Sequence, residues 1–210
     1  MQNLNARERG SLQEEIVQQI HQFHGHMCPG LAMGIRAAEI ALDQVGKHAS
    51  DEEVVAVVET DMCAVDAIQF LTGCTFGKGN LIHRDYGKNA FTFIRRSDGK
   101  SLRILTKSEA WGERDPEHAQ LFAKVREGQA TAEEKERFQT EHAARARSIL
   151  EAPVARLFDI QQVQVRVPRK ARIHNSLPCE DCGEMVMETR IRKFKGRNLC
   201  IPCFEKLEAR

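Results

Sequence analysis

The chain has 210 residues and a formal net charge of +1, with 31 Lys and Arg against 30 Asp and Glu. This length permits one or two domains with a sizeable core, and the charge balance argues against a grip on nucleic acid by the whole protein. Residues 1–20 are polar rather than signal-like, and no apolar run approaches the ~20 residues that cross a bilayer. We therefore expect a cytoplasmic protein with no membrane contact.

The first part of the chain alternates predicted helices with one apolar strand. Ser11 and Glu14 form a capping box, and apolar residues then repeat at helical spacing until Gly25 and Pro29 interrupt them. The run EVVAVVE has the β-branched character of a buried strand. In order, the expected elements are a helix over 11–23, a helix over 30–45, a strand over 53–59 and a helix over 63–71.

The middle of the chain adds a hairpin, two helices and a further strand. The Asp98-Gly99 pair is a turn signal, and Thr131 with Glu134 makes a second capping box. The expected elements are strands over 91–94 and 102–105, helices over 116–127 and 131–150, and a strand over 162–167, where Val163, Val165 and Val167 alternate. Together these elements predict an α+β fold for residues 1–167, a mixed core domain with helices packed on a sheet.

Four cysteines near the C-terminus predict a structural zinc site. Cys179 and Cys182 form one C-x2-C pair, 17 residues intervene, and Cys200 and Cys203 form the second pair. This spacing supplies the four thiolates that tetrahedral zinc prefers. Two disulfides are the alternative, but a chain with seven cysteines and no sign of export does not favour them.

The context of these cysteines predicts a treble-clef zinc finger over residues 168–210. Gly183 suits a tight knuckle, 185–191 reads as a strand, Lys195-Gly196 as a turn and 198–199 as the return strand. Pro202 lies near the start of a final helical stretch, where proline is tolerated. Residues 168–178 read as a linker without strands. From residue 166 onward there are 11 Lys and Arg against 6 Asp and Glu, so the tail is basic.

A second group of metal donors lies in the segment HGHMCPG. His24, His26 and Cys28 alternate, so in an extended segment they share one face. Pro29 suits the first turn of a helix, which places Cys28 near the N-cap, where the helix dipole stabilises a thiolate. Cys63 holds a similar position before the next helix. We predict a metal or active site from these four residues, with Cys28 and Cys63 as catalytic candidates and a second transition metal of unknown identity.

Cys74 and Lys78 are weaker candidates for the same site. A continuous helix from Cys63 to Cys74 spans on the order of 16 Å, so one metal ion cannot bind both thiols of one chain. Cys74 is therefore a packing residue, serves elsewhere, or reaches the site across a subunit interface. Lys78, in a Gly-Lys-Gly-Asn loop, is a candidate anion-binding residue. Four other histidines read as structural: His21, His48, His118 and His142.

The stretches FHGHMCPGLAMGIRAAEIAL (23–42), ETDMCAVDAIQFLTGCTFGKGNL (59–81) and HRDYGKNAFTFI (83–94) resemble the family named after the E subunit of formylmethanofuran dehydrogenase. The resemblance covers roughly residues 10–165, and some members append a treble-clef finger. It implies an α+β core and a homodimer in which the His/Cys motif and the TGCT-x-GKGN segment line a shared pocket. Tungsten or molybdenum chemistry belongs to other subunits of that holoenzyme, and this chain lacks the additional cysteine runs of iron–sulfur clusters.

Three functions follow from these features. The first is a metal-binding protein of anaerobic one-carbon or redox metabolism, related to methanogenesis by resemblance and acting on a small-molecule substrate as an oxidoreductase-associated protein. The second is an accessory or adaptor subunit that docks partner subunits through the finger and the basic linker. The third is a zinc-finger regulator that binds nucleic acid through Arg190, Arg192, Lys193, Lys195 and Arg197, which the charge balance disfavours.

Overall fold

A computed structural model describes residues 14–49, 51–112 and 115–209 of the chain. The chain separates into a core unit, Met1–Lys170, and a finger unit, Ala171–Arg210. The boundary lies three residues after the one that the sequence suggests. No helix within the described ranges is long and apolar enough to cross a membrane.

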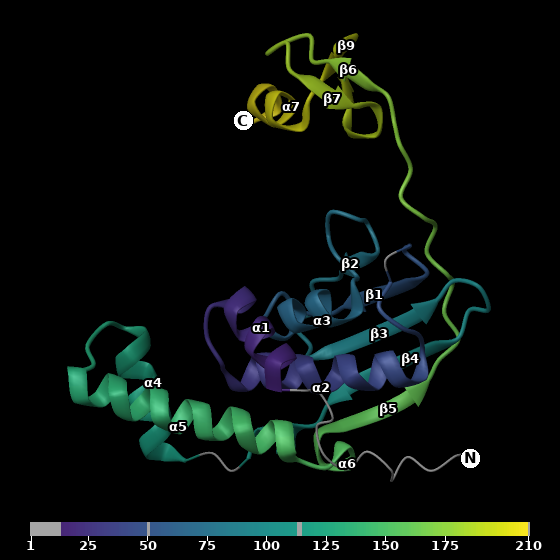
Figure 1. Cartoon of the computed structure of the whole chain (residues 1–210). Coiled ribbons are helices and arrows are strands. Elements are labelled where there is room, and N and C mark those ends of the chain that lie inside the picture. Colours follow the sequence, from purple (N-terminus) through teal and green to yellow (C-terminus); the bar gives the residue numbers. More distant parts are fainter. Residues whose placement is uncertain (1–13, 50, 113–114, 210) are drawn as a thin grey trace. The chain divides into compact units, whose positions relative to one another are not determined.

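The core unit is a mixture of helices and strands, as the sequence predicts (Figure 1). Its elements are α1 (Glu14–His24), α2 (Pro29–Gln44), β1 (Val54–Val58), α3 (Ala64–Thr72), β2 (Leu81–His83), β3 (Ala90–Arg95), β4 (Ser101–Thr106), the short 3-10 helix η2 (Ser108–Trp111), α4 (Pro116–Arg126), α5 (Ala132–Glu151), α6 (Val154–Leu157) and β5 (Phe158–Gln162). The predicted capping box of Thr131 and Glu134 is present at the start of α5. The other predicted capping box needs Ser11, which lies outside the described residues.

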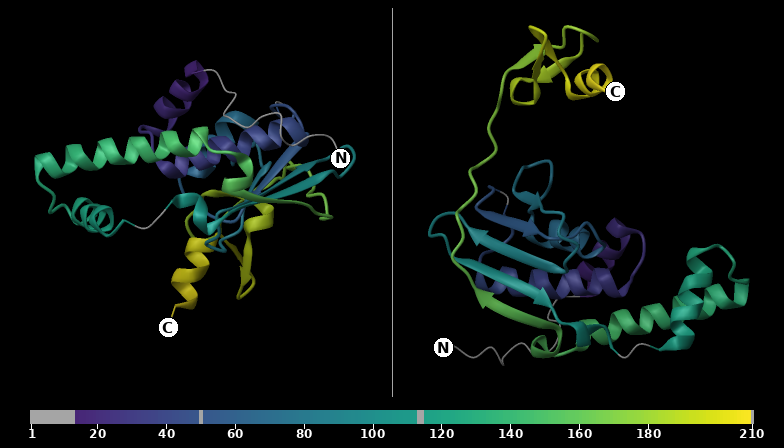
Figure 2. Two further views of the ribbon diagram at one scale, coloured as in Figure 1. Left: turned by 90° about the horizontal axis from the view of Figure 1, so that it is seen from below. Right: turned by 180° about the vertical axis from the view of Figure 1, so that it is seen from behind.

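Five strands of the described residues form one mixed sheet in the order β2-β1-β3-β4-β5. β2 runs parallel to β1, and the remaining neighbours are antiparallel. Helices α1, α2 and α3 lie on one face of this sheet (Figures 1 and 2). Large apolar side chains, among them Phe91, Phe93 and Ile104, are fully buried in the core cluster that the sheet shares with these helices.

Helices α2 and α3 approach each other very closely at Gly34. A Cβ atom added to Gly34 would lie 2.6 Å from the Cα of Ala64 and would also overlap the Ala64 carbonyl oxygen. Because Gly34 has no side chain, the start of α3 packs directly against the backbone of α2. The two helix starts, with Cys28 before one and Cys63 before the other, are thereby brought together.

One strand of the core, β5, is misplaced in the sequence prediction, and one strand, β2, is absent from it. The strand expected over 162–167 is wrong: β5 covers Phe158–Gln162, and residues 163–167 form no strand. Pairing with β4 decides this, because Ile160 lies opposite Ile104 while Val165 is exposed. The valine alternation therefore does not mark a buried face. β2 was not predicted, since three residues are too few to show a period.

The finger unit contains β6 (Ser176–Pro178), β7 (Met185–Met187), the 3-10 turn η3 (Glu188–Arg190), β8 (Arg192–Phe194), β9 (Arg197–Leu199) and α7 (Ile201–Glu208). Of the strand predicted over 185–191, only β7 forms, and it pairs with β6. η3 follows it, and the strand that pairs with β9 is β8, which begins after the predicted range. β6 lies in the segment that the sequence predicts to be a linker without strands. This strand forms because Ser176–Pro178 pair with β7. Lys195 and Gly196 form the predicted turn, both with positive φ.

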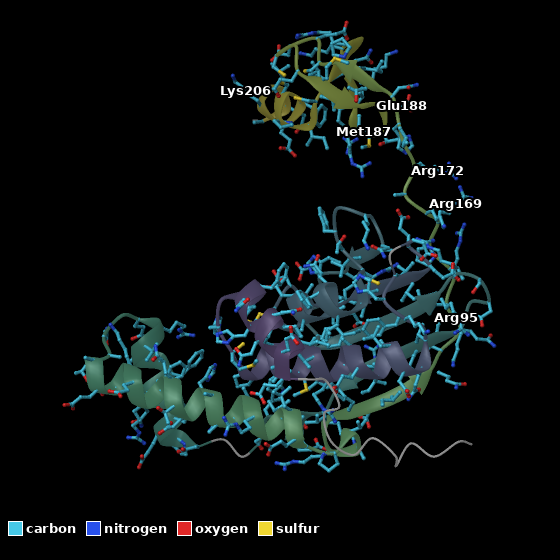
Figure 3. The ribbon with its side chains drawn as sticks, viewed as in Figure 1. Arg95, Arg169, Arg172, Met187, Glu188 and Lys206 are labelled. Carbon is cyan, nitrogen blue, oxygen red and sulfur yellow. The ribbon has the colours of Figure 1, made fainter. Side chains whose placement is uncertain are left out.

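The basic side chains of the linker are exposed. Arg166, Arg169, Lys170 and Arg172 are all exposed to solvent. Figure 3 labels Arg169 and Arg172 on the extended segment between β5 and β6. At its start, the carbonyl oxygens of Pro168 and Arg169 accept hydrogen bonds from the Arg96 guanidinium, which ties this end of the linker to the core unit.

Candidate metal centres

The finger brings its four cysteines together as the spacing predicts. The sulfur atoms of Cys179, Cys182, Cys200 and Cys203 all lie within 4.8 Å of one another. Gly183 has a φ of +77° and donates its N–H to the Cys179 carbonyl, which forms the knuckle. The Cys200 N–H lies 3.2 Å from the Cys179 sulfur. Backbone N–H groups of Cys182 and Cys200 lower the pKa of Cys179 to about 6, which favours the thiolate that zinc binds.

Few apolar residues hold the finger unit together. Its buried cluster consists of Cys179, Leu199 and Cys200, and two of these are members of the cysteine group. Phe194 and Phe204 pack edge to face, with ring centroids 5.6 Å apart. A unit of 40 residues with so small a core needs an additional source of stability, such as a bound metal ion.

The core unit holds a second donor group at the start of α2. Donor atoms of His24, His26 and Cys28 lie within 4.8 Å of one another. His24 ends α1, and Cys28 is the N-cap of α2, where its sulfur accepts the Leu31 N–H at 3.3 Å. The three side chains that the sequence groups together therefore lie close to one another, and a metal or active site there stays a prediction.

Cys63 lies next to this group but outside it. A Cβ atom added to Gly30 would be 3.8 Å from the Cys63 sulfur and 3.9 Å from the Cys28 sulfur, so both thiols face the same small space. Cys63 precedes α3 and is partly exposed, whereas Cys28 is 4% exposed. A side chain at position 30 would contact both sulfurs and the Cβ of Cys63, so glycine at this position leaves room for the two thiols to face each other.

The expected thiolate at Cys28 is contradicted by its surroundings. Burial, together with the neighbouring Cys63, raises the pKa of the Cys28 thiol to about 11, although the Leu31 N–H acts in the opposite direction. Desolvation therefore outweighs the helix N-terminus. In the absence of a metal, Cys28 is a protonated thiol at neutral pH, and a metal ion that binds it must displace the proton.

Asp66 fixes the orientation of His24, a role that the sequence did not reveal. The Asp66 carboxylate lies 2.6 Å from Nδ1 of His24 across the α1–α3 contact. The opposite ring nitrogen, Nε2, is buried and has no hydrogen-bond partner. Metal-binding histidines commonly donate one N–H to a carboxylate and present the other nitrogen to the metal. His24 is arranged in this way, and its unpartnered nitrogen shows that the residues fit a metal ion.

His26 forms the exposed side of the same group. Its ring lies 4.7 Å from that of His24, centroid to centroid. Partial burial, together with the neighbouring His24 and His21, lowers the pKa of His26, so its ring is neutral at pH 7. A neutral imidazole is the form that binds a metal. His24 and Cys28 are thus on the inner side of the group, and His26 borders solvent.

Replacing Asp66 with asparagine should weaken metal binding to the core group by about 10- to 100-fold, because the amide no longer orders the His24 ring as a carboxylate does. Competition titration of Zn²⁺ against a chromophoric chelator measures the change. Asp61→Asn, at an exposed position before α3, is the matched control and should leave the affinity unaltered. Equal affinities for Asp66→Asn and the wild type would contradict this role.

Cys74 and Lys78 lie at the other end of α3. Cys74 is fully buried, and its sulfur lies 3.3 Å from the Val54 carbonyl oxygen. The Lys78 ammonium donates to the Ala49 carbonyl at 2.8 Å. The nine residues of α3 separate this end from Cys63 by roughly 13 Å. Within one chain, therefore, neither residue joins the His24–Cys28 group.

Two family models match this chain, one over the core unit and one over the finger unit. A family model described as "FmdE, Molybdenum formylmethanofuran dehydrogenase operon" matches residues 23–159. A second model, described as "Prokaryotic dksA/traR C4-type zinc finger", matches residues 172–209. The finger is therefore a zinc finger with a structural zinc site formed by its four cysteines.

Two individual proteins extend the comparison. A protein of Archaeoglobus fulgidus described as "Probable S-adenosyl-L-methionine-binding protein" is 35% identical over 191 residues, which cover 87% of this chain and 50% of that protein. The chain thus spans about half the length of this relative. The crystal structure of a tungsten formylmethanofuran dehydrogenase FmdE-like protein from Syntrophus aciditrophicus has the same fold, with a TM-score of 0.59, 23% identity and 94% coverage of both chains.

Proposed function

The chain belongs to the FmdE family, and on this premise we propose that its core binds a transition metal through His24, His26 and Cys28, with Cys63 beside it, and takes up a small molecule there. The observation that carries the proposal is the buried, unpartnered Nε2 of His24. A buried polar atom without a partner costs on the order of 1–3 kcal/mol, so its retention calls for a ligand. The protein is a metal-binding protein through its finger already; the core would supply the second site.

The donor count distinguishes the proposed core site from the finger. The finger offers four thiolates, which close a tetrahedral zinc site. The core group offers two imidazoles and one thiol within 4.8 Å, so a fourth position stays open for a small molecule. A metal bound there would act as a Lewis acid towards a carbonyl group or water. Open positions are typical of sites that do chemistry rather than hold a fold together.

The residues of the chain have separate tasks in this proposal. Asp66 holds the His24 ring, and Cys28 supplies a buried sulfur whose proton leaves when the metal binds. Cys63 faces the same space from α3 and is partly exposed, so it is the thiol that a small molecule can reach. We place the protein in anaerobic one-carbon or redox metabolism, in the cytoplasm and as a homodimer, on the strength of its family.

Cobalt substitution tests the core site directly. Protein prepared anaerobically, with zinc in its finger, should bind one further Co²⁺ and develop a thiolate-to-cobalt charge-transfer band in the near ultraviolet. Cys28→Ser should lose this band, because the metal loses its only sulfur donor from the group. Cys74→Ser, which alters a buried thiol at the far end of α3, should retain it. A wild-type protein that binds no second Co²⁺ would overturn the proposal.

An accessory or adaptor subunit is the second candidate, and the match of residues 172–209 to a C4-type zinc finger favours it. In this function the exposed arginines and lysines of the linker and finger dock a partner protein or nucleic acid, and the core need not turn over a substrate. The cobalt titration separates the two functions, because an adaptor does not require a core metal. S-adenosyl-L-methionine, named in the description of the Archaeoglobus relative, is the first small molecule to titrate into the cobalt-loaded protein.

A further inference from the structure

His142 is a partly buried histidine of α5 whose buried ring nitrogen, Nδ1, has no hydrogen-bond partner. Among the described residues, four buried side-chain polar atoms lack a partner: His24 Nε2, Arg36 Nε, Thr106 Oγ1 and His142 Nδ1. The sequence suggested that His142 is a satisfied structural residue, like His48 and His118. Those two do have partners, since His48 Nδ1 lies 3.0 Å from the Leu71 carbonyl oxygen and His118 Nδ1 lies 2.9 Å from the Glu141 carboxylate. Nδ1 of His142 has no such partner among the described residues.

The register of α5 against α2 places His142 at the core metal group. Figure 1 shows the two helices side by side and running in the same direction. They are tied together where the Arg36 guanidinium donates to the Ala152 carbonyl at 3.1 Å. Cys28 precedes Arg36 by eight residues, roughly 12 Å of helix, and His142 precedes Ala152 by ten residues, roughly 15 Å. His142 therefore lies level with the segment from His24 to Cys28.

The face of α5 that carries His142 also points towards this segment. Ala146 and Ile149, four and seven residues later, share the helix face of His142. Both are buried in the same core cluster as Cys28 and Ile20. His142 thus continues the buried stripe of α5 by one turn, beyond the start of α2 and towards His26.

Aromatic rings hold His142 in this position. Its ring stacks on Phe138, with centroids 4.6 Å apart and planes at 29°, and Phe122 and His118 lie further along the same stack. Burial, with His118 and His26 nearby, lowers the pKa of His142, so its ring is neutral at pH 7. With its proton on Nε2, the neutral ring has a hydrogen-bond acceptor at Nδ1, on the buried side.

We propose that His142 is a further binding residue of the core site, which accepts a hydrogen bond at Nδ1 from a small polar molecule bound beside His26. The ligand class that fits is a molecule that binds the metal and carries its own N–H or O–H donor. This inference rests on the proposed core metal. His142 is not one of the metal donors, because its nitrogens do not belong to the group of donor atoms that lie within 4.8 Å of one another.

Two probes of the cobalt-loaded protein test the role of His142. Acetohydroxamic acid binds metal ions and carries a hydrogen-bond donor, whereas thiocyanate binds metal ions and carries none. The finger site is closed and holds zinc, so probe-dependent changes in the visible spectrum report the core. His142→Phe should bind acetohydroxamic acid roughly tenfold more weakly than the wild type, which corresponds to the loss of one hydrogen bond. Its affinities for Co²⁺ and for thiocyanate should be unchanged.

Two more substitutions distinguish a binding role of His142 from a structural one. His142→Asn places a polar atom where Nδ1 lies and should restore part of the acetohydroxamic acid affinity, whereas His142→Gln, whose amide matches Nε2, should not. Unchanged acetohydroxamic acid binding in His142→Phe would overturn the inference alone. Loss of Co²⁺ itself in that variant would also overturn it, by making His142 a metal donor. If the wild type binds no core Co²⁺, the proposed function fails, and this inference fails with it.

Discussion

Gly34→Ala should destabilise the core unit by about 3 kcal/mol, the upper end of the usual cost of overpacking. The added methyl group would meet the backbone of Ala64, including its Cα at 2.6 Å, and a backbone cannot move aside as a side chain does. The two helices must separate, and the Cys28 and Cys63 thiols would separate with them. The direction of the stability change is informative, because replacing glycine with alanine inside a helix otherwise stabilises a protein by about 1 kcal/mol.

Urea unfolding followed by tryptophan fluorescence measures this effect. The chain has a single tryptophan, Trp111, and it lies in the core unit, so the signal reports that unit alone. Gly77→Ala is the control, since a Cβ there meets nothing within 4 Å, and its stability should stay within about 0.5 kcal/mol of the wild type. A Gly34→Ala protein as stable as the wild type, or more so, would contradict the close approach of α2 and α3.

Cys179→Ser should release the finger zinc and unfold residues 171–210. A structural zinc contributes about 10–16 kcal/mol to the folding of small zinc-finger peptides, and the apolar cluster of this unit is too small to replace it. Elemental analysis should show one zinc fewer per chain, and trypsin should rapidly cleave the finger. The unfolding transition of Trp111 should remain, because the core is a separate unit.

Lys193→Ser, at an exposed position of β8, is the matched control for the finger and should keep both zinc and resistance to trypsin. Full zinc content and an intact finger in Cys179→Ser would mean that this cysteine is not a ligand.

Features decided by neighbouring residues could be predicted from the sequence. The two C-x2-C pairs, the Lys195-Gly196 turn and the N-cap position of Cys28 each depend on a few adjacent residues and on strong local preferences. The gathering of His24, His26 and Cys28 belongs to the same class, because five consecutive positions contain all three donors.

Features decided by tertiary contacts could not be predicted in this way. The pKa of Cys28 depends on burial and on Cys63, which α3 supplies. The pairing of Asp66 with His24 exists because α1 and α3 meet, and the position of β5 follows from its pairing with β4. His142 is 116 residues from His26, and only the register of α5 against α2 places the two at one level.

The measurement that tests the central claim most directly is the metal content per chain of anaerobically purified protein, determined for the wild type, Cys28→Ser and Cys179→Ser. We predict two metal equivalents in the wild type, with one lost in each variant, because the core and the finger bind their metals independently. A wild type with a single zinc that is lost only in Cys179→Ser would contradict a metal site at His24, His26 and Cys28.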